Sequence, residues 1–126
     1  MADPQRLAAL RAAMTAARVD ACIVPSADPH LSEYLPPRWQ AREWLSGFTG
    51  SAGTLVALPA TAGLWTDSRY FEQGERELAG SGIELMRQRV PHAPEHIAWL
   101  ADHLAPRTTV AVAGDSISLA QQRALE

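Results

Sequence analysis

The chain has 126 residues, of which 47% are hydrophobic and 20% are charged. This composition is typical of one globular domain and too apolar for a disordered chain. The formal net charge is −3, and charges of one sign form no block, which argues against a nucleic-acid-binding or membrane-binding surface. No apolar run approaches the roughly 20 residues needed to cross a bilayer, and no targeting segment is visible. These features predict a cytoplasmic protein without a nucleic-acid or membrane partner.

Cys22 is the one cysteine of the chain. A single cysteine cannot form an internal disulfide, which fits a reducing cytoplasm. Because Cys22 lies in an apolar run, we expect a small buried hydrophobic residue rather than a catalytic thiol.

The first third of the chain predicts a helix, a strand and a loop. Asp3 and Pro4 form a typical helix start, because the carboxylate accepts from free backbone N–H groups and proline is preset for the first turn. The apolar residues that follow keep the spacing of one helix face: Leu7, Leu10, Met14 and Ala17. A short apolar strand is expected at Val19–Val24, and the prolines within residues 25–37 predict a loop.

The middle of the chain predicts a helix, a hairpin and a second helix. Helical spacing of apolar residues returns over residues 41–48. Two short apolar runs, Thr54–Leu58 and Leu64–Thr66, flank a turn-like segment and predict an antiparallel hairpin. The residues Tyr70–Ala79 predict a helix that ends at Gly80.

The last third alternates strand and helix. We expect a strand with one solvent-facing side at Ile83–Gln88, a helix opened by Pro94, a buried strand at Thr108–Ala113 and a final helix from Ser118. That final pattern has no stop signal, so we expect a piece of a longer protein. The alternation predicts one α/β domain over residues 1–126, in three layers, with a mixed five- or six-stranded sheet, one hairpin, and helices on both faces.

The segment S-G-F-T-G-S-A-G at residues 46–53 carries three glycines at intervals of three. A dinucleotide-binding loop requires G-x-G-x-x-G after a strand and before a helix, whereas this segment follows a helix and precedes a strand. A P-loop requires a lysine, and the chain contains none. We therefore interpret the glycines as conformational: Gly47 ends a helix, and Gly50 and Gly53 permit a tight turn and a close backbone approach.

Histidines, serines and tryptophans form no catalytic or metal-binding pattern. His92 and His96 have the spacing of a zinc pair on one helix, but Pro94 separates them. His96 and His103 alone are too few ligands, so we expect exposed or capping histidines. No serine has the strand-to-helix setting of G-x-S-x-G. The tryptophans, at residues 39, 44, 65 and 99, are expected in core or edge packing.

The stretch T-D-S-R-Y-F at residues 66–71 places an arginine where a helix is expected to begin. Asp67 and Ser68 are typical turn and capping residues, which puts Arg69 in the first helical turn. A cation at that end opposes the helix macrodipole. Arg69 therefore needs an anionic partner, either Asp67 or a ligand carboxylate.

Four stretches together resemble the N-terminal domain of the Xaa-Pro aminopeptidases (aminopeptidase P), of the creatinase/prolidase N-terminal family. They are L-x-x-L-R at 7–11, I-V-P-S-A-D-P-H-L-S-E-Y at 23–34, S-G-F-T-G-S-A-G-T at 46–54 and W-T-D-S-R-Y-F at 65–71. They occur in the family's order over nearly the whole chain, and the second is similar to the cytosolic multidomain branch. One departure is Ser68, where relatives often carry glycine.

The resemblance implies a non-catalytic domain of an enzyme that releases an N-terminal residue preceding proline. In this family a C-terminal pita-bread domain performs the hydrolysis with two divalent metal ions, commonly manganese, so no cofactor is expected in this segment. The N-terminal domain contributes to the substrate cleft and to homo-oligomer contacts. The family's substrate-contacting arginine corresponds to Arg69. His30 and Tyr34 are further candidates for substrate binding that could equally brace their loop.

Two other functions remain open from the sequence. The chain could be a stand-alone ligand- or protein-binding module without peptidase activity, or an independent hydrolase. The length of the parent reading frame and the presence of metal-binding residues in it distinguish these alternatives.

Overall fold

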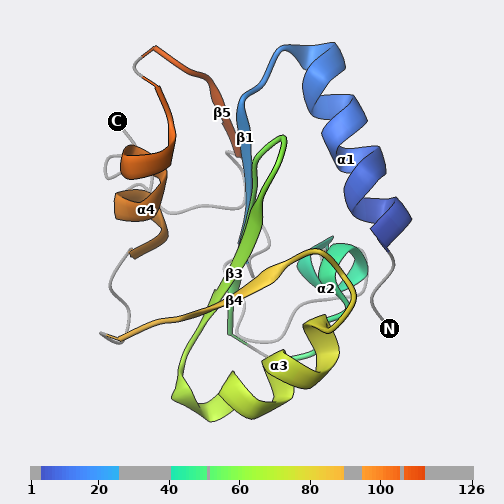
Figure 1. The fold of residues 1–126 in the computed structure, drawn as a ribbon, viewed down its shortest axis with the longest axis vertical. Coiled ribbons are helices and arrows are strands. Elements are labelled where there is room, and N and C mark those ends of the chain that lie inside the picture. Colours follow the sequence, from blue (N-terminus) through green and yellow to red (C-terminus); the bar gives the residue numbers. More distant parts are fainter. Residues whose placement is uncertain (1–3, 26–40, 51, 90–94, 106, 113–126) are drawn as a thin grey trace, which may run out of the picture.

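A five-stranded mixed sheet lies at the centre of this structure, a computed structural model that describes residues 4–25, 41–50, 52–89, 95–105 and 107–112 (Figure 1). The strands lie in the order β4-β3-β2-β1-β5. Their bounds are Ala21–Pro25 for β1, Thr54–Ala57 for β2, Ala62–Thr66 for β3, Glu84–Arg87 for β4 and Val110–Val112 for β5. The helices are α1 (Pro4–Ala17), α2 (Ala41–Ser46), α3 (Phe71–Leu78) and α4 (Glu95–His103), and a 3₁₀ turn at Ser68–Tyr70 precedes α3.

The strand pairing follows from the connections between the strands. β2 and β3 form the expected hairpin, with Leu55 opposite Leu64. β1 pairs antiparallel with β2, and β5 pairs parallel with β1. α3 connects β3 to β4, which lie parallel, as a helical crossover allows. The described part of the chain thus contains the predicted mixed sheet, with five strands.

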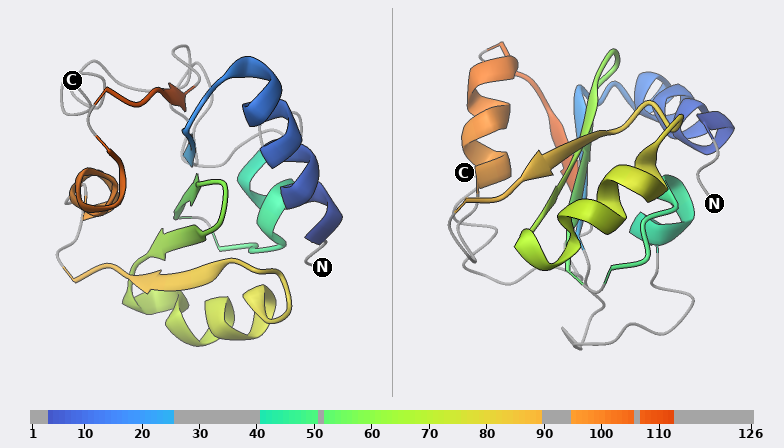
Figure 2. Two further views of the ribbon diagram at one scale, coloured as in Figure 1. Left: turned by 45° about the horizontal axis from the view of Figure 1, so that its top comes forward. Right: turned by 60° about the horizontal axis from the view of Figure 1, so that its bottom comes forward.

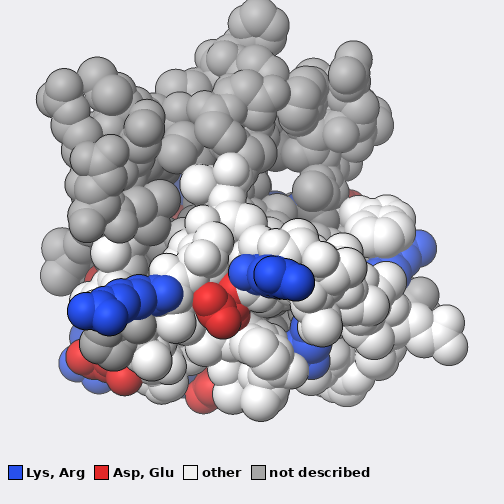
Figure 3. Space-filling view, turned by 90° about the horizontal axis from the view of Figure 1, so that it is seen from above, with Lys and Arg blue, Asp and Glu red and all other residues white. Residues whose placement is uncertain are grey.

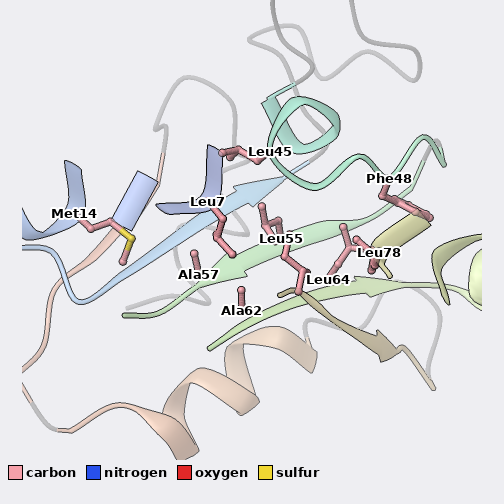
Figure 4. Close-up of a cluster of buried hydrophobic side chains, with 10 residues drawn as sticks. Leu7, Met14, Leu45, Phe48, Leu55, Ala57, Ala62, Leu64 and Leu78 are labelled. Atoms are coloured by element: carbon pink, nitrogen blue, oxygen red, sulfur yellow. The ribbon is translucent and has the colours of Figure 1, made fainter. Parts of the chain in front are cut away.

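One face of the sheet packs against α1, α2 and α3 (Figure 2). Figure 4 shows the buried side chains between these helices and the strands. The cluster consists of Leu7, Met14, Leu45, Phe48, Leu55, Ala57, Ala62, Leu64, Leu78 and Ile83. Leu7 and Met14 supply the stripe that α1 turns to the sheet, as their spacing predicts. Fully burying one leucine side chain contributes about 1.5–3 kcal/mol, so this layer is a main source of stability.

The opposite face of the sheet is covered by α4 (Figure 2). The second cluster contains Ala21, Ile23, Val56, Leu58, Trp65 and Leu100. Leu55 and Val56 are adjacent in β2, yet they belong to different clusters because successive strand residues point to opposite faces. Since both faces are covered, β2 and β3 are apolar without alternation. The predicted three-layer α/β architecture, with helices on both faces, is confirmed.

The expected elements occur in the predicted order, with bounds shifted by a few residues. One expectation was wrong: the strand predicted as buried at Thr108–Ala113 is the short β5, which is only half-buried. Its place at the end of the strand order explains this, because it pairs on one side with β1. The helix expected from Ser118 lies outside the described residues. Within the described ranges, no helix is long and apolar enough to cross a membrane.

Replacement of Leu64 by alanine is expected to lower the free energy of unfolding by about 2–5 kcal/mol, because Leu64 is fully buried in β3 and alanine leaves a cavity. Leu85 is its direct partner on the neighbouring strand β4 and is only half-buried. Leu85→Ala is the matched control and should cost clearly less. Urea unfolding of both variants measures the difference, and equal losses would contradict the placement of the core.

Candidate functional site

Two of the four stretches that carry the sequence resemblance lie against each other in the fold. We call residues 46–50, 52 and 53 the glycine segment, and residues 65–71 the arginine motif. The Thr66 hydroxyl donates to the Ala52 carbonyl over 2.7 Å. The Phe48 and Tyr70 rings pack edge to face, with centroids 5.9 Å apart. A polar and an aromatic contact therefore join segments that are separated in the sequence.

The glycines act conformationally, as predicted, at two positions. Gly47 has φ 76°, a left-handed conformation, and its N–H donates to the Glu43 carbonyl over 2.8 Å, which ends α2. At Gly50, a Cβ atom would lie 2.4 Å from Cζ of Phe48 and 3.0 Å from the Tyr70 ring. No side chain fits there without moving two packed rings. Gly50 is therefore what allows the glycine segment to approach the arginine motif.

Arg42 of α2 fixes the glycine segment from inside the protein. Its side chain is only 7% exposed. One terminal nitrogen donates to the Gly50 carbonyl, and the other donates to the Gly53 carbonyl over 3.5 Å. The guanidinium also lies over the Phe48 ring, 5.1 Å from its centroid. Burial away from water lowers the pKa of Arg42, but an arginine remains protonated at neutral pH.

Glu77 of α3 holds the exposed side of the same segment. Its carboxylate accepts from the Thr49 N–H over 3.0 Å and from the Thr49 hydroxyl over 2.8 Å. The Gln73 side-chain amide donates to both Glu77 and Thr49. Partial burial alone would raise the pKa of Glu77, but these hydrogen bonds and the nearby Arg76 outweigh it and lower the pKa. The network thus favours the ionised carboxylate.

Arg69 is held by Asp67 in a two-point ion pair. Its Nε donates to Oδ1 of Asp67 over 3.0 Å, and its Nη2 donates to Oδ2 over 2.9 Å. The Arg69 backbone N–H also donates to Oδ1 over 3.0 Å, so Asp67 caps the 3₁₀ turn as predicted. The Arg69 side chain is 67% exposed, and its guanidinium lies 5.1 Å from the centroid of the Tyr70 ring. The sequence left two anionic partners open for Arg69, Asp67 or a ligand carboxylate. In the fold Asp67 is a partner of Arg69.

A groove of about 1000 Å³ adjoins this pair. Asp67 is one of its lining residues, together with parts of β4, α3 and α4. Its lining includes aromatic side chains and charged ones, among them Trp65, Phe71, Glu95 and Trp99. Figure 3 shows one face of the molecule on which basic and acidic side chains are interspersed and form no broad patch of one sign. The groove therefore has a mixed apolar and polar lining.

The described residues include part of the histidines and tryptophans of the chain. Four residues named in the sequence analysis lie outside the described residues: His30, Tyr34, Trp39 and His92. His103 bonds through Nδ1 to the Trp99 carbonyl in the last turn of α4, as a capping histidine does.

His96 is half-buried against the Trp65 ring, so the expectation of exposure was wrong for it, and burial lowers its pKa. Cys22 is half-buried, not fully buried as expected, and burial raises the pKa of its thiol.

Trp65 is buried, as expected, whereas Trp44 is 54% exposed and lies against the Arg6 guanidinium. Within the described ranges, no three His, Cys, Asp or Glu side chains come together in a way that could hold a metal ion.

Sequence reasoning missed Arg42 and Glu77. Both act on backbone groups of the glycine segment, and Glu77 is 28 residues from its partner Thr49. No local signal in the sequence distinguishes Arg42, because Arg42 and Glu43 are adjacent charged residues between the apolar positions of the same predicted helix.

Arg42→Lys is expected to lower the free energy of unfolding by about 1–3 kcal/mol, because one ammonium cannot replace a planar fork that reaches two carbonyls. Arg76→Lys, on the exposed side of α3, is the matched control and should have little effect. Chemical denaturation of the two variants tests this, and a stability for Arg42→Lys equal to that of the parent would refute the anchoring role.

The stability contribution of Glu77 is expected to depend on pH. Because its folded-state pKa is lowered, the contribution is complete above the unfolded pKa of about 4.3 and is lost as the pH falls through the lower folded value. Glu77→Gln removes the titration but keeps an acceptor for Thr49. The stability difference between parent and variant should therefore shrink on acidification from pH 7 to pH 3, as measured by urea unfolding. A difference that stays constant would contradict this.

Comparisons with known proteins agree with the arrangement. The family model described as the creatinase/prolidase N-terminal domain matches residues 6–126. A protein of Pyricularia oryzae named "Probable Xaa-Pro aminopeptidase P" is 44% identical over 96% of this chain and 19% of its own length. Aminopeptidase P2 of Arabidopsis thaliana is 48% identical over 75% of this chain and 13% of its own length. This chain thus spans about a fifth or less of these relatives.

Solved structures show the same fold. X-prolyl aminopeptidase of Caenorhabditis elegans, described as a cytosolic enzyme with a di-nuclear active site, superposes with a TM-score of 0.86 at 30% identity, over 95% of this chain and 21% of that one. The N-terminal, creatinase/prolidase-like domain of a Corynebacterium diphtheriae protein superposes with a TM-score of 0.71 at 29% identity, over 97% of this chain and 84% of that one. The chain therefore belongs to the creatinase/prolidase N-terminal domain family, in the form found in Xaa-Pro aminopeptidases.

Proposed function

We propose that this chain is the non-catalytic N-terminal domain of a Xaa-Pro aminopeptidase and that Arg69 forms part of the substrate cleft. The parent enzyme releases an N-terminal residue that precedes proline. The observation that carries the proposal is the exposed guanidinium of Arg69. Arg69 lies in the arginine motif, which packs against the glycine segment in a domain of this family. A guanidinium suits the planar oxygen acceptors of a peptide, its carbonyls and its carboxylate.

The position of Arg69 next to the groove supports the same role. Asp67 contacts Arg69 and also lines the groove, so an extended peptide bound at Arg69 has an adjoining channel of about 1000 Å³. Aromatic residues such as Trp99 supply apolar contact area there. We infer that the domain grips the peptide while another domain cleaves it. His30 and Tyr34 remain proposed contacts from the shared sequence stretch.

The chemistry is assigned to a C-terminal catalytic domain of the same polypeptide. The described residues do not fit a two-metal centre, since no three metal-ligating side chains come together among them. We place two divalent ions, which we expect to be manganese, in that other domain. The C. elegans relative is described as cytosolic with a di-nuclear active site, which supports a cytoplasmic dinuclear enzyme. Contacts between homo-oligomer subunits are proposed as a second role of this domain.

Arg69→Ala in the full-length enzyme is expected to lower kcat/KM for Xaa-Pro peptides by roughly 10-fold to 150-fold, the equivalent of about 1.5–3 kcal/mol for a charged hydrogen bond. Metal content should stay normal, because Arg69 is not assigned to the metal site. Steady-state kinetics and elemental analysis measure both quantities.

Arg76→Ala is the control, since Arg76 is also a solvent-exposed arginine but lies on the outside of α3. It should leave the kinetics unchanged. Unaltered kinetics of Arg69→Ala on several peptides would refute the substrate role. Sustained hydrolysis of a Xaa-Pro peptide by the 126-residue chain with Mn²⁺ would refute the assignment of the chemistry to another domain.

A further inference from the structure

We propose that Asp67 is a positioning residue for substrate binding: it fixes the orientation of the Arg69 guanidinium before the peptide arrives. The inference rests on the proposed function of Arg69 and goes beyond it, because it assigns a role to a residue that need not touch the peptide. Its basis is the geometry of the pair and of the residues packed around it.

Arg69 donates both side-chain hydrogen bonds to Asp67 from one edge of its guanidinium. Nε and Nη2 of Arg69 each donate to a different carboxylate oxygen, over 3.0 Å and 2.9 Å. A two-point contact between two planar groups fixes their relative orientation, which one bond cannot do. This side-on arrangement directs the opposite end of the group, which carries Nη1, away from Asp67. In this proposal, that end of the guanidinium faces an acceptor oxygen of the bound peptide.

Asp67 is itself held more firmly than Arg69. Its side chain is 29% exposed against 67% for Arg69. Oδ1 also accepts from the Arg69 backbone N–H over 3.0 Å, which locks the carboxylate to the 3₁₀ turn. The less exposed partner, which is also bonded to the backbone, therefore sets the position of the more exposed one, and a long side chain loses less conformational freedom when the peptide binds.

The Tyr70 ring supports the guanidinium from a second direction. Arg69 lies 5.1 Å from the centroid of this ring, and the ring is braced edge to face by the fully buried Phe48. A carboxylate in the plane of the guanidinium and an aromatic ring against it constrain different movements. Together they connect the orientation of Arg69 to the packed core.

The test separates positioning from capping, because Asp67 does both. Asp67→Asn and Asp67→Ser each keep an oxygen that accepts from the Arg69 N–H, but neither forms the charged two-point contact. In the full-length enzyme, both variants are expected to raise KM by about fivefold to twentyfold with a smaller effect on kcat. Melting temperature and metal content should remain those of the parent. Glu72→Gln, at an exposed carboxylate of α3 that does not line the groove, is the matched control and should leave KM unchanged.

A double-mutant cycle tests whether Asp67 acts through Arg69. In an Arg69→Ala background, Asp67→Asn should have no further effect on KM. An undiminished effect there, or a normal KM for Asp67→Asn while Arg69→Ala is impaired, would overturn the inference and leave the proposed function standing. Normal kinetics of Arg69→Ala itself would overturn both. Binding of a non-hydrolysed peptide inhibitor, measured by calorimetry, should show the same pattern without turnover.

Discussion

The hydrogen bonds from the buried Arg42 guanidinium to the Gly50 and Gly53 carbonyls are the constraint on which the proposed site depends. A loop that leaves a helix and enters a strand has backbone oxygens that neither element can satisfy. Arg42 satisfies two of them from a position that is 7% exposed. A buried charge is costly unless it is hydrogen-bonded, so this arrangement stabilises one loop conformation and penalises others. Buried hydrogen bonds to a charged group therefore favour the observed loop conformation.

The same constraint extends to Arg69 through two aromatic rings. The loop conformation that Arg42 fixes places Phe48 in the core, and Phe48 braces Tyr70, on which the Arg69 guanidinium lies. Gly50 makes the contact possible because a side chain there would collide with both rings. Each step is an ordinary packing contact. Through these contacts together, the buried Arg42 of α2 helps to define the position of the exposed Arg69 in the arginine motif.

Features that depend on neighbouring residues could be predicted from the sequence. Features that depend on contacts between distant segments could not. Three features follow from residues that are close in the sequence: the hairpin, the end of α2 at Gly47 and the cap at Asp67. The role of Arg42 could not be predicted, because it depends on the loop folding back over its own helix. His96 was expected to be exposed, and only the packing of α4 against Trp65 buries it. The left-handed residue after α1 is Arg18, with φ 59°, where a glycine would be the usual signal.

The pairing of β5 with β1 has a consequence for how the chain folds during synthesis. Asp20 and Thr109 bond to each other through backbone and side-chain groups, although they are 89 residues apart. The hairpin and the crossover to β4 need only neighbouring segments and can assemble early. One side of β1 stays without its neighbour until the ribosome has delivered residue 110 and those that follow. During that interval the nascent sheet presents bare backbone groups, the state in which strand edges are most open to pairing with the wrong chain.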